Sequence, residues 1–314
     1  MIISRIIFIL ISLLIASCAT QTNDIEVSVT IPDSNLLRHL HYLSSDELQG
    51  RKVGSSGGAL AQGYLVEQLK KAGVQPFGQE YLAPFIIERS FNDLKANNVI
   101  AYVPGTKKTE KFIVLSAHFD HIGGQGKRIY NGADDNASGT AALLHYAKRL
   151  QQRPLGYSVI LLFTDGEESN LKGAKAFVAQ NQQLMTSIIL NINLDMIAGN
   201  RRTKKLQYIS RSLETLLTEK QMAAYISNFE SAPVQVKKGF RGVGFNNQNN
   251  KVKWEVASDH GVFYKNNIPF IYFGVGTHSN YHQISDTYQN ANHEFFLNAV
   301  ETIYQQLIFL DQNL

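Results

Sequence analysis

FIVLSAHFDH, residues 112–121, joins a run of apolar and β-branched residues directly to two histidines and an aspartate. A short run that is apolar at successive positions is typical of a strand covered on both faces. Similar runs are NNVIAYV (97–103), YSVILLF (157–163), IILNINL (188–194) and PFIYFGV (269–275). We predict a strand in each of these segments.

Helical spacing of apolar residues alternates with these runs. The predicted helices cover residues 35–48, 57–72, 138–151, 173–181, 213–229 and 294–310. Alternation of this kind predicts an α/β fold with a mainly parallel central sheet and helices on both of its faces. Residues 197–254 are rich in Gly, Asn and Lys, and we predict loops over one edge of the sheet there.

The first residues of the chain have a different composition. Residues 1–17 carry one charged side chain, Arg5, before an apolar run that ends in small residues, which is typical of a secretory signal peptide. Cys18, the only cysteine, follows in the string LIASC, which resembles a bacterial lipobox. We therefore predict an exported protein, lipidated at Cys18, tethered by residues 18–33 and followed by one catalytic domain, 34–314. A plain signal peptide with an incidental cysteine is the alternative.

Ala19, after that cysteine, resembles lipoproteins sorted to the outer membrane. The predicted location is therefore the bacterial cell envelope, on the outer membrane facing the periplasm. The chain has 30 basic and 26 acidic residues, a net charge of +4, which is too weak and dispersed to indicate a nucleic-acid partner. The oligomeric state is left open by the sequence.

Metal-type ligands follow most of the predicted strands. They are His118, Asp120 and His121 after the second strand, Glu167 and Glu168 after the third, Asp195 after the fourth, and His278 and His282 after the fifth. Taken singly, each of these signals has a structural interpretation. His118 and Asp120 form a structural pair at a strand end, and Glu167 and Glu168 form a solvated turn. Asp134, Asp135 and Asn136, ahead of the helix at 138–151, are helix caps. Together they meet at one edge of an open α/β sheet, where uncompensated carboxylates repel one another. A multivalent cation resolves this repulsion, and mixed imidazole and carboxylate ligands suit zinc.

The motifs HFDH, GADDNASG, DGEES, NLDM and YHQISDT occur in this order. This series resembles the co-catalytic di-zinc exopeptidases, a family that includes bacterial leucyl aminopeptidase and glutamate carboxypeptidase II. The resemblance begins near Leu43, in LSSDELQGR, and extends to the C-terminus. It implies the phosphorylase/hydrolase-like zinc exopeptidase fold, two Zn²⁺ ions per chain and peptide substrates.

The resemblance also implies a role for individual residues. The implied metal ligands are His118 and Asp195 for one zinc, Glu168 and His282 for the other, and Asp134 as the bridge between them. Glu167 takes the place of the catalytic carboxylate, and Asp120 that of the acid orienting His118. His282 is preferred to His278 because it precedes Asp286 and Thr287 with the family's spacing. A cis peptide is implied between Asp134 and Asp135.

The implied activity is zinc-dependent aminopeptidase action, with Glu167 accepting a proton from the attacking water. A carboxypeptidase or dipeptidase of the same family is the alternative, with Arg241 as the candidate for holding a substrate carboxylate. A glutaminyl cyclase uses one zinc and lacks the full ligand set, and a non-catalytic zinc-binding lipoprotein has no need of Glu167. Ser258, Asp259 and His260 match a family string, SDH, with either a substrate-contacting or a supporting role.

Overall fold

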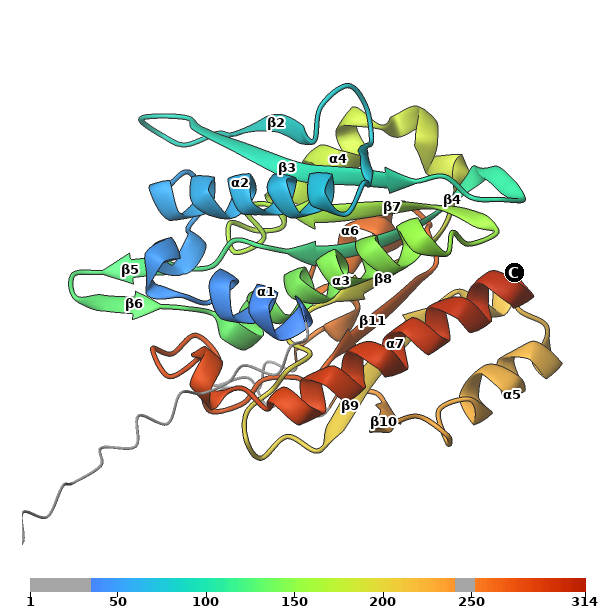
Figure 1. Ribbon diagram of the computed structural model, residues 1–314. Helices are drawn as coiled ribbons and strands as arrows, with labels where there is room; N and C mark the ends of the chain where they lie inside the picture. Colours follow the sequence, from blue (N-terminus) through green and yellow to red (C-terminus); the bar gives the residue numbers. More distant parts are fainter. Residues whose placement is uncertain (1–34, 241–251) are drawn as a thin grey trace, which may run out of the picture. The chain divides into compact units, whose positions relative to one another are not determined.

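The computed structural model describes residues 35–240 and 252–314. A central mixed sheet runs through this part of the chain in the order β1-β3-β7-β4-β8-β11-β9-β10, with β2 paired to β3 (Figure 1). Its strands are β1 Gln75–Pro76, β2 Leu82–Ile87, β3 Leu94–Val103, β4 Lys108–His118, β7 Tyr157–Thr164, β8 Ile188–Leu194, β9 Lys205–Arg211, β10 Gln235–Lys238 and β11 Phe270–Gly274. A separate hairpin pairs β5 Gly123–Gln125 with β6 Arg128–Tyr130.

The middle of the sheet is parallel and its margins are mixed. β7, β4, β8 and β11 are parallel neighbours, whereas β3 joins β7, and β9 joins β11, in antiparallel pairing. All eight residues of β7 are buried, which is what a central strand covered on both faces requires. The predicted α/β class is confirmed, and the five predicted strands are present.

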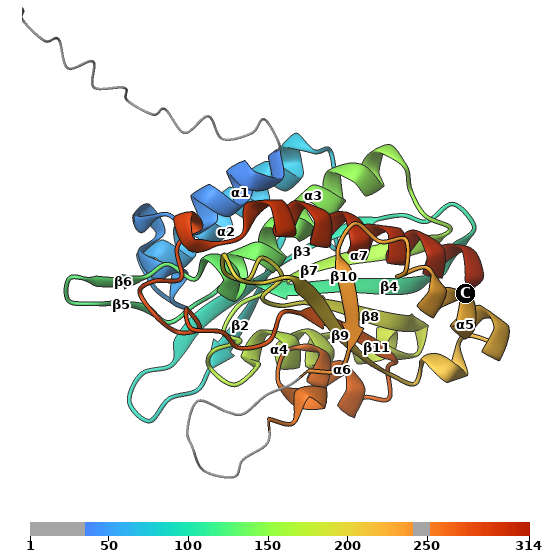
Figure 2. The same ribbon diagram turned by 90° about the horizontal axis from the view of Figure 1, so that it is seen from below.

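Helices cover the sheet on both faces. Figure 2 shows α1, α2, α3 and α7 on one face, and α4 and α6 on the other. The helices are α1 Asn35–Leu43, α2 Ser56–Lys71, α3 Gly139–Gln152, α4 Lys172–Gln180, α5 Glu219–Ser227, α6 His260–Lys265 and α7 His293–Asn313. The short helical turns are η1 Asp46–Arg51, η2 Ala133–Ser138, η3 Gln182–Ser187, η4 Leu213–Thr215, η5 Trp254–Val256 and η6 Tyr288–Asn290. In the described part of the chain, no helix has the length and apolar character that a membrane crossing needs.

The loops predicted for residues 197–254 are partly wrong. The structure forms two unpredicted strands, β9 and β10, within this interval, and β9 pairs with β11 inside the sheet. It also forms α5, which lies inside the predicted helix 213–229. The sequences of β9 and β10, KLQYISR and QVKK, are polar at many positions and therefore lack the continuous apolar runs of the central strands. Pairing with a neighbouring strand, rather than local apolar character, makes these segments extended.

The parallel strands bring distant residues to one edge of the sheet. β4 ends at His118, β7 at Thr164, β8 at Leu194 and β11 at Gly274. Because these four strands are parallel, their carboxyl ends lie at the same edge. The segments that follow them build the site described next.

Candidate metal centre

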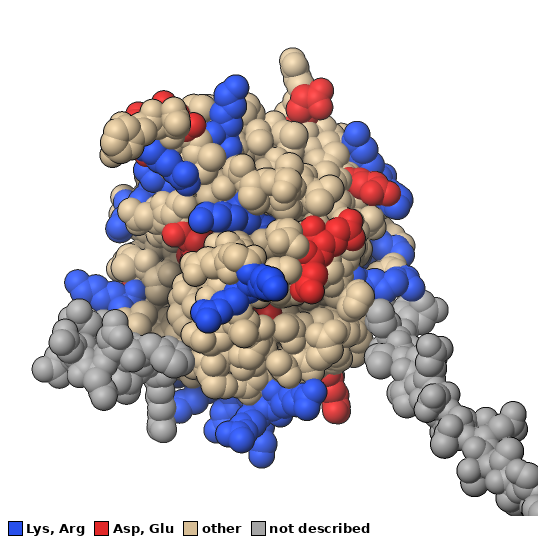
Figure 3. Space-filling view, turned by 90° about the vertical axis from the view of Figure 1, so that its left-hand side faces the viewer, with Lys and Arg blue, Asp and Glu red and all other residues tan. Residues whose placement is uncertain are grey.

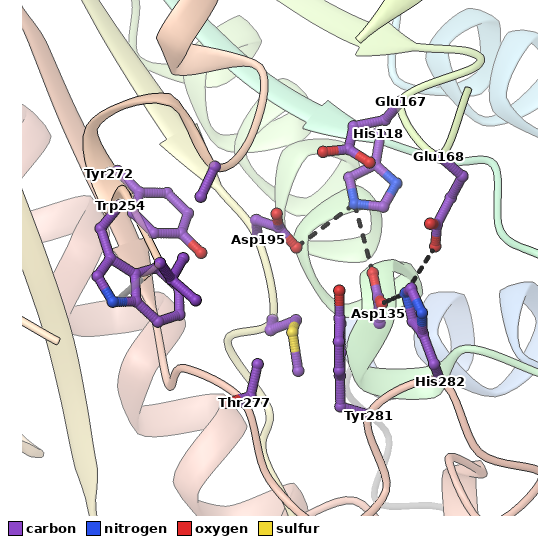
Figure 4. Close-up of a pocket in the computed structure, with 13 residues that line it drawn as sticks. His118, Asp135, Glu167, Glu168, Asp195, Trp254, Tyr272, Thr277, Tyr281 and His282 are labelled. Carbon is purple, nitrogen blue, oxygen red and sulfur yellow. Dashed lines mark hydrogen bonds and ion pairs between the residues drawn. The ribbon is translucent and has the colours of Figure 1, made fainter. Parts of the chain in front are cut away.

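Two groups of ligand-type side chains share Asp135 at this edge. The first group contains His118, Asp135 and Asp195, and the second contains His121, Asp135, Glu168 and His282. In the first group, His118 Nε2 lies 3.4 Å from Asp135 Oδ1 and 3.4 Å from Asp195 Oδ1. Figure 4 shows Asp135 between the two groups, with its carboxylate facing both His118 and His282.

The second group is equally compact. His282 Nε2 lies 3.2 Å from Asp135 Oδ2 and 3.2 Å from Glu168 Oε1. His121 Nδ1 lies 2.9 Å from the same Glu168 oxygen and 3.8 Å from Asp135 Oδ2. The two oxygens of Asp135 therefore face different groups, which is the arrangement of a carboxylate that bridges two ions.

Asp134, the predicted bridge, does not lie in either group. Its Oδ1 accepts hydrogen bonds from the backbone N–H groups of Ala198 and Gly199, both at 2.7 Å. Its Oδ2 lies 2.7 Å from His278 Nε2. The carboxylate is thus already occupied by protein donors, and the position next in sequence, Asp135, faces the cluster instead.

The expected cis peptide is displaced by the same single residue. It lies between Asp135 and Asn136, not between Asp134 and Asp135. The loop before it depends on Gly132, whose φ of 55° is left-handed and whose added Cβ would lie 2.1 Å from the Asp135 carbonyl oxygen. The glycine of GADDNASG therefore permits the close backbone approach that places Asp135.

Two polar side chains fix the backbone of this loop. The Asp286 carboxylate accepts hydrogen bonds from the N–H groups of Asp134 and Asp135, each at 3.0 Å. Asn136 donates to the Leu194 carbonyl and accepts from the Met196 N–H, which flank Asp195. These contacts hold the loop against the ends of other strands, so that ligand-type residues from separate motifs keep a common geometry.

Asp120 has a role beyond the one expected for it. Its carboxylate accepts hydrogen bonds from the backbone N–H groups of Glu167 at 3.0 Å and Glu168 at 3.3 Å. His118 Nδ1 lies 3.1 Å from the Asp120 backbone carbonyl oxygen and 3.7 Å from its carboxylate. Asp120 therefore positions both the His118 ring, mainly through its main chain, and the turn that carries the two glutamates.

Glu167 and Glu168 point to different parts of the site. The Glu167 carboxylate lies beside His118 in Figure 4, whereas Glu168 faces His282. Burial raises the pKa of the Glu167 carboxyl well above its ordinary value, and the positive charge of His118 opposes this effect only partly. Burial acts in the same direction on Glu168, but the imidazoles of His121 and His282 outweigh it and lower its pKa. The adjacent glutamates thus have opposite protonation tendencies.

The histidines respond to the surrounding carboxylates. Burial disfavours a charge on His118, but Glu167 and Asp195 outweigh burial and raise the pKa of its imidazole well above the usual value. The same balance raises the pKa of His282 to about 10, through Asp135 and Glu168. Glu168 Oε1 is a buried atom that accepts no hydrogen bond of normal geometry, although His121 Nδ1 and His282 Nε2 lie 2.9 and 3.2 Å from it. A dense, buried set of carboxylates and imidazoles with unpartnered donor atoms fits a divalent cation, and mixed N and O donors fit zinc.

His278 and His282 take separate places, and His282 is the one that lies in a ligand-type group. His282 adopts a left-handed φ of 54° and its ring stacks on Tyr281, with ring centroids 3.9 Å apart. His278 contacts Asp134 and belongs to neither ligand-type group.

The SDH string, Ser258, Asp259 and His260, contacts the strands that lead to the site. Thr164, at the end of β7, donates a hydrogen bond to Asp259, and Asn193 donates to Ser258 at 3.0 Å. His260 is buried and stacks on Tyr272, with centroids 4.4 Å apart, while its Nε2 lies 2.8 Å from the Trp254 carbonyl oxygen. The string therefore connects the ends of β7 and β8 to a cluster of stacked rings, Phe240, Trp254 and Tyr272, which we call the aromatic wall.

That wall borders a pocket of about 240 Å³ beside the ligand-type residues. Phe240 stacks on Trp254 at 4.5 Å and on Tyr272 at 5.0 Å between ring centroids. The pocket is lined by His118, Asp135, Glu167, Glu168, Asp195, Met196, Val252, Trp254, Ala257, Tyr272, Thr277, Tyr281 and His282. Among the described residues, its lining has no Lys or Arg.

The molecular face shown in Figure 3 has no such separation of charge, because Lys and Arg are interspersed there with Asp and Glu.

Arg51, in LSSDELQGR, is completely buried. Its guanidinium donates to the backbone carbonyls of Phe119 at 2.7 Å, Asn131 at 2.6 Å and Gly132 at 3.0 Å, and also to that of Leu43. It thus ties the first helix to both loops that carry His118 and Asp135. Two predicted residues, Cys18 and Arg241, lie outside the described part of the chain.

Sequence reasoning missed Asp135 and His121 as members of the ligand-type groups. Both stand in the motifs that were singled out, but spacing alone does not distinguish Asp134 from Asp135. The only sequence signal for His121 is that it is the second histidine of HFDH. This signal does not show whether the side chain faces the other ligand-type residues.

Comparison with known proteins assigns the chain to one peptidase family. The sequence profile described as peptidase family M28 matches residues 98–307. The chain is 27% identical over 168 residues to the alkaline phosphatase isozyme conversion protein of Escherichia coli, covering 48% of each chain. It is 24% identical over 286 residues to a protein named probable leucine aminopeptidase from Arthroderma otae, covering 86% of this chain and 70% of the relative.

A third relative is named probable lipoprotein aminopeptidase LpqL, from Mycobacterium tuberculosis. It is 29% identical over 159 residues, covering 49% of this chain and 31% of the relative. The alignments thus cover about half or less of the length of the first and third of these relatives.

Solved structures share the fold. A Zn-dependent exopeptidase from Parabacteroides distasonis superposes with a TM-score of 0.64 at 19% identity, covering 88% of this chain and 97% of that one. A glutaminyl cyclase from Fimbriiglobus ruber has a TM-score of 0.66 at 15% identity, covering 89% and 96%.

Proposed function

This chain belongs to peptidase family M28, and from that premise we propose that it is a zinc-dependent aminopeptidase that releases N-terminal residues from peptides. The observation that carries the proposal is the pocket, in which two ligand-type groups and Glu167 meet an aromatic wall. Relatives named as aminopeptidases agree with this assignment.

The proposed site holds two Zn²⁺ ions. His118 and Asp195 are assigned to one ion, Glu168 and His282 to the other, and Asp135 to the bridge. The support is geometric, because these side chains converge with separations of 3.2–3.4 Å between the atoms concerned. Zinc, when bound, supplies a Lewis acid that polarises the scissile carbonyl and acidifies a water molecule.

Glu167 is the proposed general base. It lines the pocket and is assigned no metal bond, so its carboxylate is free to accept a proton. The protonated carboxyl then donates to the amine that leaves when the peptide bond breaks. Asp120, which holds the Glu167 N–H, keeps this carboxylate in place.

An aminopeptidase is favoured over a carboxypeptidase by the charge of the pocket. Among the described lining residues, Asp135, Glu167, Glu168 and Asp195 are acidic, and none is Lys or Arg. Asp135, Glu168 and Asp195 are assigned to the zinc ions, but a substrate carboxylate requires a cationic side chain, and the described lining offers none. Arg241, the candidate cation for the alternative activity, lies outside the described residues.

Three matched peptides test the activity. Zinc-loaded full chain is assayed with one sequence as the free peptide, the N-acetylated peptide and the C-terminally amidated peptide. We expect release of the first residue from the free and amidated forms, and no release from the acetylated form. Cleavage of the acetylated form with loss of activity on the amidated form identifies a carboxypeptidase and contradicts the proposal.

We further propose that the protein is exported and lipid-anchored in the cell envelope. The supports are the signal-type residues 1–17, Cys18 in LIASC and the similarity to a relative named a lipoprotein. The proposed organisation is a tether over residues 18–33 and one catalytic domain, 34–314, on the outer membrane facing the periplasm. Cys18→Ser should abolish lipid attachment in mass spectrometry of the mature chain. Unchanged membrane fractionation of this variant contradicts the lipid anchor.

A further inference from the structure

His121 is a buried histidine to which the proposed function assigns no role. The residue is 1% exposed, and among the described residues neither Nδ1 nor Nε2 makes a hydrogen bond of normal geometry, although Nδ1 lies 2.9 Å from Glu168 Oε1. A buried polar atom without a hydrogen bond destabilises the fold unless another ligand satisfies it. The ring is therefore expected to have a ligand that the protein's own hydrogen bonds do not supply.

The Nδ1 atom of this ring points into the second ligand-type group. It lies 2.9 Å from Glu168 Oε1 and 3.8 Å from Asp135 Oδ2. The other separations in the group, from His282 Nε2 to those two carboxylates, are both 3.2 Å. Ligands about 2.0–2.2 Å from a tetrahedral zinc ion are roughly 3.4 Å apart. The four separations, from 2.9 to 3.8 Å, lie on both sides of that value, and all the donor atoms of the group lie within 4.8 Å of one another.

We propose that His121 Nδ1 is a fourth protein ligand of the second zinc site, together with Asp135, Glu168 and His282. This inference rests on the proposed function, because it adds a ligand to the site assigned there. Coordination accounts for Nδ1 and leaves Nε2 as the protonated nitrogen of a neutral ring.

The local packing selects this ring position. Gly132 lies against the imidazole, and a Cβ at residue 132 would come within 2.6 Å of His121 Cδ2. The ring also meets His282 edge to face, with centroids 5.6 Å apart and planes at 70°. Two imidazoles from different segments thus approach the shared Glu168 oxygen from different directions, as two ligands of one ion do.

With His121 as a ligand, the two metal sites differ in the number of protein donors. The first group offers three donors, one of them nitrogen, whereas the second offers four, two of them nitrogen. Zinc sites closed by four protein ligands are typically structural, and sites with three keep a position open for catalysis. The second site is therefore expected to fill first and to release its ion last.

Metal titration of the full chain tests the proposal. Chelator-treated protein is titrated with Zn²⁺ by calorimetry, with a competing chelator for tight binding, as wild type, His121→Ala and His121→Asn. Wild type should show two binding events of different affinity. His121→Ala should weaken the tighter event at least about 10-fold and leave the weaker event unchanged.

The asparagine variant separates a ligand from a positioning residue. Its amide can donate a hydrogen bond to Glu168 from near the Nδ1 position, but it is a poor zinc ligand. We expect His121→Asn to lose affinity as His121→Ala does. Wild-type affinity in His121→Asn assigns the ring to positioning and overturns the proposal. His278→Ala is the matched control, because this imidazole pairs with Asp134 and should not affect either event.

Cobalt spectroscopy gives a second readout that does not depend on turnover. With one equivalent of Co²⁺, the visible absorption of wild type should be that of a four-coordinate site with nitrogen donors, and it should change in His121→Ala. Identical spectra overturn the proposal. If wild type binds one ion or none, the proposed function fails instead, so the two failures are distinguishable.

Discussion

The Asp120 Oδ1 atom accepts a hydrogen bond from the Glu167 backbone N–H at 3.0 Å. Its other oxygen accepts from Glu168, so one carboxylate fixes both neighbouring glutamates. Asp120→Asn replaces one acceptor by an amide donor that faces an N–H group. We expect metal affinity to fall about 10–100-fold, as for other residues that support metal ligands, with a parallel loss of kcat. Equal metal content and kcat in variant and wild type would contradict this role.

Asp134 and Asp135 form a matched pair for the bridge. Asp135→Asn removes the charge shared by both ligand-type groups, so both ions should bind weakly and activity should be lost. Asp134→Asn keeps an oxygen that accepts from Ala198 and Gly199, so metal content should stay near wild type. Elemental analysis of both dialysed variants is the measurement. Metal loss in the Asp134 variant alone would reverse the assignment.

Much of this arrangement is predictable from sequence. The apolar runs of β4, β7, β8 and β11 identify central parallel strands, and parallel strands place their carboxyl ends together. His118, Glu168, Asp195 and His282 follow those runs, and the structure brings them together with Asp135. The strand β9 was not predictable, because pairing with β11 rather than its own polar sequence makes it extended.

The error at Asp134 has a local cause. Two adjacent aspartates have the same chemistry, and only their surroundings distinguish them. The N–H groups of Ala198 and Gly199, more than sixty residues away, occupy the first carboxylate. Such long-range partners leave no local pattern in the sequence.

Arg51 is expected to stabilise the loops that carry His118 and Asp135. Lys in its place carries its three N–H donors on one nitrogen and cannot reach four carbonyls with the geometry of a guanidinium. We expect Arg51→Lys to lower the free energy of unfolding by about 2–3 kcal/mol in urea denaturation. The control is Arg149→Lys, whose partner Glu301 is partly exposed, with a loss of about 0–1 kcal/mol. Equal small losses in both variants would refute this role of Arg51.

His39 should make stability depend on pH in a defined window. Burial, with a smaller effect of His145, lowers the pKa of His39 to about 4, whereas the unfolded chain has a value near 6.5. Between these values the unfolded chain binds a proton that the folded chain does not, so falling pH destabilises the fold. His39→Gln removes this contribution. The free energy of unfolding of wild type relative to the variant should fall between pH 6.5 and 4, by at most about 3 kcal/mol. A pH-independent difference would contradict the shift.

Turnover of a free-amino peptide by zinc-loaded Glu167→Gln, with metal content measured on the same sample, tests the central claim most directly. Glu167 is assigned no metal bond, so two ions per chain should remain while kcat falls by about 10²–10⁴-fold. Glu168→Gln is the control, and it should lose metal from one site. Near wild-type turnover of Glu167→Gln with both ions bound, or loss of metal from this variant, contradicts the account.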